Sequence, residues 1–245
     1  MSEQSMSGDA SGVVTPPAKP ASWWEDYIDI FYAPSQVFAR RMHSGFGVPM
    51  LVVTVLIGAI FLANSSAMQP IMDAEFARAM AKQSAKMTPE QMEAARSIGA
   101  KFAKVGVFFI LPITMFLVGL TLWIIGKIFG AKQTLGAAFM VAAYAYVPKI
   151  LEAVLGGVQL LLLDSSSMNG RYKLSLGVGR FLDPDTAAPA LVAFLGRVDV
   201  FTIWVTILLG IGLSVTGKIS RSNAMMAAVI IWFIGAAATV LPALR

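Results

Sequence analysis

Residues 105–126 read VGVFFILPITMFLVGLTLWIIG, and none of these side chains is charged. A transmembrane helix needs about 20 consecutive apolar residues, so this stretch is long enough to cross a bilayer. Pro112 is its only interruption, and membrane helices tolerate proline because neighbouring groups satisfy the freed backbone. The stretch therefore predicts a membrane span.

Four similar apolar runs lie on either side of it, at residues 47–63, 134–163, 200–216 and 224–241. The run 134–163 is too long for one straight span, at about 45 Å as a helix. We therefore expect it to tilt, to kink at Pro148, or to break there into a re-entrant hairpin. Residues 45–245 together predict one all-α domain, a polytopic membrane helical bundle of about five transmembrane helices.

The composition supports the same class of protein. Hydrophobic residues make up 57% of the chain and charged residues 13%, against about 25% charged in soluble domains. The formal net charge is +5, but the basic residues lie mostly between the apolar runs. They therefore indicate topology rather than nucleic-acid binding, and no nucleic-acid partner is expected.

Catalytic and metal-binding motifs were sought and not found. The chain has no cysteine, which excludes thiol catalysis and Cys-ligated metals, and its only histidine is His43. It also lacks a phosphate-binding Gly-Lys-Ser/Thr loop, a His-Glu-x-x-His motif and a Gly-x-Ser-x-Gly elbow. We therefore expect neither an enzyme nor a cofactor.

The segment before the first run divides into two parts. Residues 1–21 are rich in Ser, Ala, Gly and Pro and predict a disordered tail. Residues 22–44 predict short amphipathic helices at the membrane interface.

The first of these helices should begin at Ser22, with Glu25 completing a capping box. Aromatic and apolar side chains recur on one face at helical spacing: Trp23, Trp24, Tyr27, Ile28 and Phe31. Pro34 should end the helix, and a second helix should follow with Arg40 and Arg41 on its polar side. The aromatic face could lie in the interface or pack on the bundle, and the two options are compatible.

Two polar segments separate the spans. In residues 64–104, we expect a helix over 73–86 and a second helix that starts at Thr88 and continues into the second span. Residues 164–199 contain turn signals and a short apolar helix near 187–195.

Basic residues at span ends predict the orientation. Arg40 and Arg41, together with Lys127, Lys132, Lys218 and Arg221, fall on one side of a five-span bundle. Because cytoplasmic loops are enriched in Lys and Arg near span ends, we expect the N-terminus in the cytoplasm.

Lys149 and Glu152 are the only charges within an apolar run. They share a helix face because they lie three residues apart. Charges inside a membrane are costly and often mark a pathway or a helix contact. Two interpretations stay open, a structural ion pair and a position on a transport path.

Three segments resemble the Yip domain family, five-span membrane proteins named for interaction with Ypt/Rab GTPases. They are YAPSQVF at Tyr32–Phe38, YAYVP at Tyr144–Pro148 and DVFTIW at Asp199–Trp204, with GIGL at Gly210–Leu213. The resemblance makes Pro34, Tyr146, Pro148, Asp199, Phe201 and Trp204 candidate functional or structural residues. It implies that Asp199 caps or anchors the start of the fourth span.

The resemblance is closest to the bacterial branch, which also has a polar insertion between the first two spans. It implies a bacterial inner membrane protein that acts as a non-enzymatic scaffold or partner-binding protein in membrane organisation. Lipid, other membrane proteins or a second copy are the implied partners. Small-GTPase binding is not inferred, because Ile30–Pro34 matches the family's Asp-Leu-Tyr-Gly-Pro signature only loosely. A small transporter or channel that uses Lys149 and Glu152 is the alternative.

Overall fold

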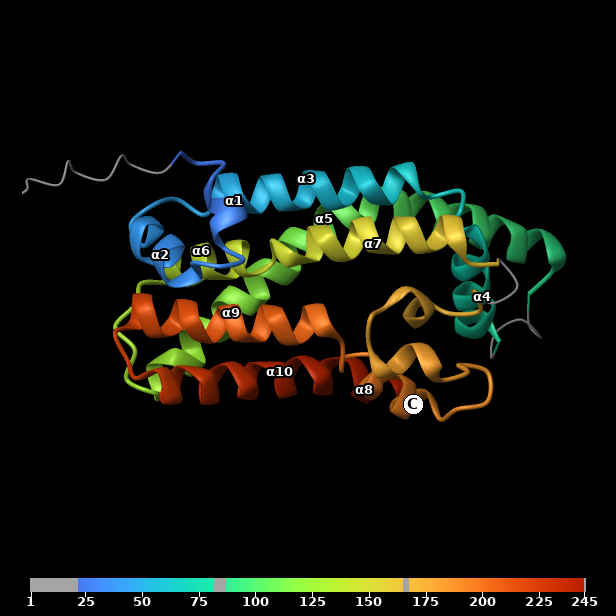
Figure 1. Ribbon diagram of the computed structural model, residues 1–245. Coiled ribbons are helices and arrows are strands. Elements are labelled where there is room, and N and C mark those ends of the chain that lie inside the picture. The colour runs from blue at the N-terminus through green and yellow to red at the C-terminus, as the bar shows by residue number, and fades with distance from the viewer. Residues whose placement is uncertain (1–21, 82–86, 165–167, 245) are drawn as a thin grey trace, which may run out of the picture.

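The computed structural model describes residues 22–81, 87–164 and 168–244 (Figure 1), so the predicted tail of residues 1–21 lies outside the described part. Within these ranges the chain is helical, and one bridge between Gly177 and Asp199 is its only extended pairing. The α-helices are α1 Asp26–Asp29, α2 Pro34–Arg41, α3 Gly47–Ala63, α4 Gln69–Met80, α5 Pro89–Ile128, α6 Leu135–Ala145, α7 Pro148–Leu162, α8 Pro189–Leu195, α9 Val200–Gly217 and α10 Arg221–Ala243. The 3₁₀ helices η3 Arg171–Leu174 and η4 Val178–Phe181 precede α8.

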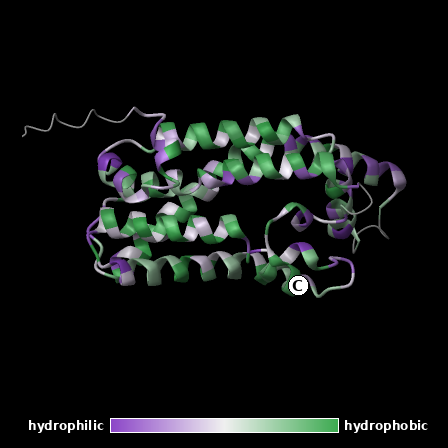
Figure 2. Cartoon of the chain, viewed as in Figure 1, coloured by the Kyte–Doolittle hydropathy of each residue, from purple (hydrophilic) through white to green (hydrophobic). Residues whose placement is uncertain are grey.

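Four of these helical stretches are long and apolar enough to cross a membrane: Pro89–Ile128, Leu135–Leu162, Val200–Gly217 and Arg221–Ala243. The apolar helix α3 has 17 residues, within the range of a short span. Figure 2 shows hydrophobic residues along these helices and hydrophilic residues concentrated in the turns and short helices at both ends of the bundle. The predicted all-α polytopic bundle is confirmed.

The third apolar run is interrupted where the sequence predicted it. Helix α6 ends at Ala145, Tyr146 and Val147 form a turn, and α7 begins at Pro148. Proline suits the first turn of a helix because it lacks the N–H that would be unsatisfied there. Figure 1 shows α7 continuing along the bundle from α6, so the interruption is a kink rather than a hairpin.

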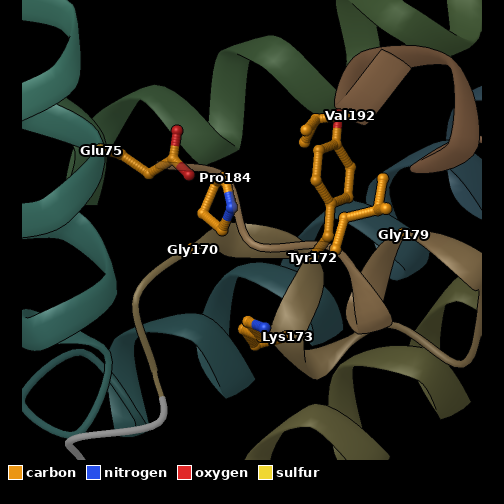
Figure 3. Close-up of a pocket in the computed structure, with 8 residues that line it drawn as sticks. Glu75, Gly170, Tyr172, Lys173, Gly179, Pro184 and Val192 are labelled. Carbon is orange, nitrogen blue, oxygen red and sulfur yellow. The ribbon is translucent and has the colours of Figure 1, made fainter. Parts of the chain in front are cut away.

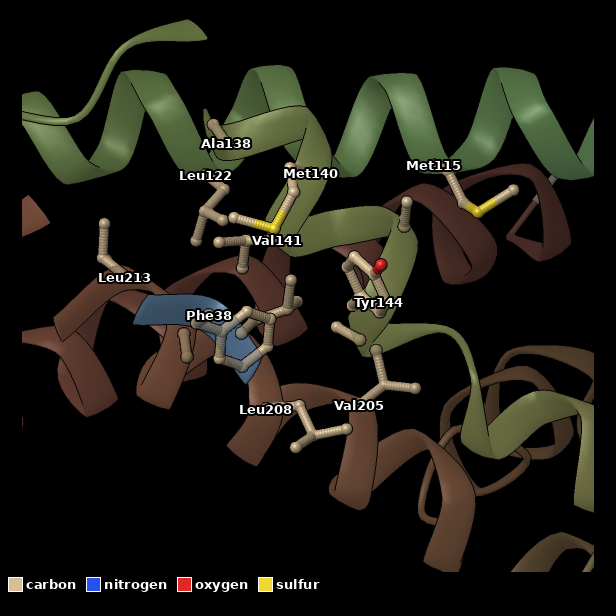
Figure 4. Packing of buried hydrophobic residues seen from close by; sticks show 14 of the residues in the cluster. Phe38, Met115, Leu122, Ala138, Met140, Val141, Tyr144, Val205, Leu208 and Leu213 are labelled. Carbon is tan, nitrogen blue, oxygen red and sulfur yellow. The ribbon is translucent and has the colours of Figure 1, made fainter. Parts of the chain in front are cut away.

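Helix α6 forms the centre of the core. It packs against α3, α5 and α9, and its alanines at 138, 142, 143 and 145 are fully buried. Small residues let the helices approach closely: a Cβ at Gly119 would overlap the Phe139 side chain, and one at Gly212 would overlap that of Val141. Figure 4 shows larger side chains such as Phe38, Met115 and Leu213 filling the space around α6.

The turns that follow α5 and α9 meet at one end of the bundle. The backbone N–H of Lys132 donates to the carbonyl of Gly217 over 2.9 Å. Lys218, directly after α9, has a positive φ of 55°. The Lys127 and Lys218 turns therefore lie at the same end of the bundle, as expected when two apolar runs separate them.

Polar interactions organise the opposite end. Thr88 caps the start of α5 as predicted, and with Gln91 it forms a capping box. The predicted helix 73–86 begins earlier, at Gln69, because Pro70 favours a first helical turn there; residues 82–86 lie outside the described part. An Arg96–Asp73 ion pair of 2.6 Å joins α4 to α5.

The first N-terminal helix is shorter than predicted, whereas the second, α2, has the expected length. Residues 23–25 form a turn, and α1 starts only at Asp26 without a side-chain cap. Half of the expected capping box is present, since the Glu25 carboxylate accepts from the Ser22 N–H over 2.9 Å. A one-turn helix has little stability of its own, so α1 depends on tertiary contacts.

Candidate functional site

A cluster of charged side chains fixes α1 and α2 to the bundle. The carboxylate of Asp26 is fully buried and accepts from the Nε atoms of Arg40 (2.6 Å) and Arg41 (2.5 Å). It also accepts from the Tyr144 hydroxyl over 3.2 Å, and Asp29 pairs with Arg40 as well. We call these five residues the N-terminal clamp.

The clamp explains why a carboxylate can be buried here. An isolated buried charge is very costly, but one that is paired and hydrogen-bonded is tolerated. The pairing with Arg40 also lowers the pKa of Asp29 below its usual value. Sequence patterns placed Arg40 and Arg41 at the interface without partners. Pro34 was expected to end the first helix, but the sequence did not reveal that the turn there brings the two short helices together.

The aromatic residues of the N-terminal segment divide between the surface and the bundle. Trp23 and Trp24 are 60% and 52% exposed. Phe31 packs edge-to-face on Trp204 with ring centroids 5.2 Å apart, and Tyr27 lies 5.8 Å from Tyr144. Packing on the bundle is therefore correct for Tyr27 and Phe31, while Trp23 and Trp24 remain exposed.

A cavity of about 480 Å³ lies toward the other end, among α3, α5, α7, η3 and the start of α9. Its polar lining includes Tyr146, Lys149, Glu152, Arg197 and Asp199, four of which the sequence singled out. The apolar lining comes mainly from α3, α5 and α7: Ile57, Ile60, Phe61, Val107, Leu111 and Leu160.

Lys149 and Glu152 are paired with each other inside this lining. Lys149 Nζ lies 2.5 Å from the Glu152 carboxylate and also donates to the Thr202 hydroxyl over 3.2 Å. The pair thus connects the first turns of α7 to α9. Each charge therefore has a neighbour of opposite sign within the bundle, although Glu152 Oε2 accepts no hydrogen bond from the described residues.

Asp199 caps α9. Its Oδ1 accepts from the backbone N–H groups of Phe201 (2.9 Å) and Thr202 (3.1 Å), which is the usual way a helix start is satisfied. The Phe201 side chain is buried and stacks on Trp204, with ring centroids 6.4 Å apart.

Arg197 also lines the cavity, but sequence patterns did not select it as a candidate residue. Its Nε is buried without a hydrogen-bond partner, and no acidic side chain in the described ranges forms an ion pair with it. Burial lowers the pKa of its guanidinium. In the sequence it is one more basic residue near a span end, and only the fold reveals its burial.

A sequence model described as the Yip1 domain matches residues 28–241. The chain belongs to the Yip1 domain family. Comparisons with curated proteins and with solved structures gave no match. The resemblance to this family is therefore confirmed over almost the whole chain, and a multi-pass membrane protein of Yip type follows from it together with the apolar helices.

The segments that carried the resemblance converge in this Yip1 domain. Pro34 starts α2, which packs on α9 close to the contact between Phe31 and Trp204. Tyr146 and Asp199, from the other two segments, both line the cavity. The residues of these three segments therefore lie around the contacts of α9 with α2 and α7.

A second hollow in the Yip1 domain lies between α4 and the 170–192 segment (Figure 3). Glu75, Tyr172 and Pro184 are among its lining residues, and its volume is about 10 Å³. This is about the space of one water molecule, so it is a packing gap rather than a ligand site.

Proposed function

We propose that this Yip1-domain protein is a non-enzymatic membrane scaffold that binds partner proteins in membrane organisation. The observation that carries the proposal is the N-terminal clamp. It uses four charges and a tyrosine to hold two short helices against the bundle, and it leaves Trp23 and Trp24 exposed beside them. A rigidly held aromatic surface is suited to contact with a partner or with lipid head groups.

The polar groups inside the bundle support a structural role. Gln133 accepts from the Thr216 hydroxyl over 2.7 Å between α9 and the start of α6. Lys149 is bound by Glu152 and Thr202. The Thr216–Gln133 and Lys149–Thr202 contacts join separate segments, which is how buried polar groups specify a membrane bundle.

We further propose a bacterial inner membrane location with five spans and a cytoplasmic N-terminus. The meeting of the two basic turns near α1 and α2 supports this orientation. Because the chain has no cysteine, single cysteines can map it. Lys132→Cys should react with an impermeant maleimide only in inverted vesicles, and Asp185→Cys only in right-side-out vesicles. The reverse pattern would refute the orientation.

Site-specific photo-crosslinking in native membranes tests the scaffold role. A photoreactive residue at Trp24 should give a discrete protein adduct, and the adduct should weaken when Asp26→Asn releases the clamp. The same residue at Phe109, which is 63% exposed on α5, is the control and should react with lipid. Lipid adducts alone at both positions would contradict partner binding.

Liposomes separate the scaffold from the transporter alternative. The reconstituted protein should give no more ion or solute flux than empty liposomes. Flux that disappears in a folded Lys149→Ala variant would overturn the scaffold proposal. Lys149→Ala should instead lower the amount of assembled protein, because it leaves Glu152 unpaired.

A further inference from the structure

The cavity beside α7 has apolar walls and a cationic end, a combination that suits an amphipathic anionic ligand. Its apolar walls come from α3, α5 and α7. The stretches that contain α5 and α7 are long and apolar enough to cross a membrane, and α3 is a shorter apolar helix. Its polar end contains the partly buried Arg197 guanidinium, whose Nε is buried. The volume of about 480 Å³ lies within the usual range of small-ligand sites.

Two charges of this lining form no ion pair within the described residues, Arg197 and Asp199. Glu152 pairs with Lys149, and Asp199 directs its Oδ1 to the backbone at the start of α9. Arg171 lies 4.0 Å from the Glu75 carboxylate. Arg197 is the cation in this lining for which the described residues provide no anionic partner.

Arg197 also lies at a depth that a lipid head group can reach. A Cβ at Gly235 would lie 2.7 Å from the Arg197 Nη2, so the guanidinium packs directly on α10 at this glycine. Gly235 precedes the end of α10 at Ala243 by about 12 Å of helix. The cation therefore lies about 12 Å of helix from the nearer end of α10 and about 21 Å from the other end.

We propose that this cavity binds one anionic phospholipid, with its phosphate on Arg197 and an acyl chain along α3, α5 and α7. A guanidinium offers several N–H donors to phosphate oxygens, and a charge-assisted contact in a dry site is strong. Basic pockets between membrane helices recognise anionic head groups in this way. The proposal goes beyond the scaffold role and does not depend on it.

Gly156 allows the cavity to be filled without disturbing its walls. It lines the cavity from α7, and a Cβ added there would meet no atom within 4 Å. Gly156→Leu should therefore occupy space that the acyl chain needs, and it should also favour the helix. Gly136 on α6 is a matched control, because a Cβ there is equally unobstructed and the residue is exposed away from the cavity.

Native mass spectrometry of the full chain provides the test, with mixed micelles of phosphatidylglycerol and phosphatidylcholine as the probe. The wild type and Gly136→Leu should each retain one phosphatidylglycerol in preference to phosphatidylcholine. Arg197→Gln should weaken retention by about tenfold or more, because it removes a charged hydrogen bond. Gly156→Leu should weaken it to a similar extent, and Arg197→Lys should recover part of the loss.

If Arg197→Gln folds poorly, the melting temperatures of the other variants, measured with and without lipid, still test the proposal. Phosphatidylglycerol should raise the melting temperature of the wild type and Gly136→Leu through linkage, and it should have much less effect on Gly156→Leu. Equal retention of both lipids by the wild type would overturn the proposal. So would full retention by Gly156→Leu, or the same stabilisation by inorganic phosphate without lipid.

Discussion

Asp26 is a fully buried charge and Arg197 a partly buried one with a buried Nε, and their surroundings differ. Asp26 receives hydrogen bonds from two arginines and a tyrosine, whereas Arg197 has no anionic partner in the described ranges. The region around Asp26 is densely packed, while Arg197 borders a cavity of about 480 Å³. A charge whose partners the protein supplies thus contrasts with one that we propose is completed by a ligand.

The turn between α6 and α7 separates the two environments. Tyr144, at the end of α6, donates its hydroxyl proton to the clamp, whereas Tyr146, two residues later, lines the cavity. The Pro148 interruption therefore lets one apolar run serve both regions.

The largest effect is expected from Asp26→Asn. The change leaves Arg41 without its carboxylate, and removing one partner of a buried pair costs about 3 kcal/mol. For a chain of this size, the melting temperature in detergent should fall by roughly 6–12 °C. Asp29→Asn is the matched control with a smaller expected effect, because Asp29 is partly exposed and forms an ion pair with Arg40 alone among the described residues. Equal effects of the two changes would mean that burial at Asp26 is not what matters.

Leucine insertions compare packing in the two regions. Gly212→Leu should cost about 1–3 kcal/mol by overpacking, because its Cβ would overlap Val141. Gly156→Leu should leave the melting temperature unchanged or slightly raised. Differential scanning fluorimetry can measure both, with Gly136→Leu as the exposed control. A similar loss at positions 156 and 212 would show that the cavity is not open.

The Lys149–Glu152 pair should behave as a coupled structural unit. In a double-mutant cycle with Lys149→Met and Glu152→Leu, the coupling energy should be about 1 kcal/mol. The double variant should be more stable than either single variant, since an apolar pair can replace a buried ion pair. Additive effects would indicate that the two charges act independently.

The smallest effect is an acid-induced loss of stability at the clamp. Since Arg40 lowers the pKa of Asp29 in the folded protein, the pair stabilises the fold above the usual value of 3.8. That stability is lost as the pH falls below 3.8 toward the folded pKa. Asp29→Asn should flatten this part of the pH–stability curve, and an unchanged curve would contradict the assignment.

Sequence patterns predicted the helices well because their signals are local. Apolar length marked the spans, Pro148 marked the interruption, and Thr88 marked the start of α5. They also selected Tyr146, Lys149, Glu152 and Asp199, which the fold gathers around one cavity.

The partners of charged residues could not be predicted in the same way. Asp26 and Arg40 are separated by 14 residues, and Tyr144 is 118 residues from Asp26. An amphipathic pattern describes which side of a helix is polar, but not whether that side faces water or another helix. The burial of Arg197 likewise depends on the packing of the 196–199 segment against α10.

Cysteine accessibility tests the contrast between the two regions most directly, since the natural chain has no cysteine. A small polar thiol reagent should label Gly156→Cys in the folded protein, and phosphatidylglycerol should slow the reaction. Ala143→Cys, at a fully buried position of α6, should react only after unfolding. Equal labelling at positions 143 and 156 would contradict the contrast between a closed region beside the clamp and an open cavity beside α7. No protection of position 156 by phosphatidylglycerol would contradict lipid binding in that cavity.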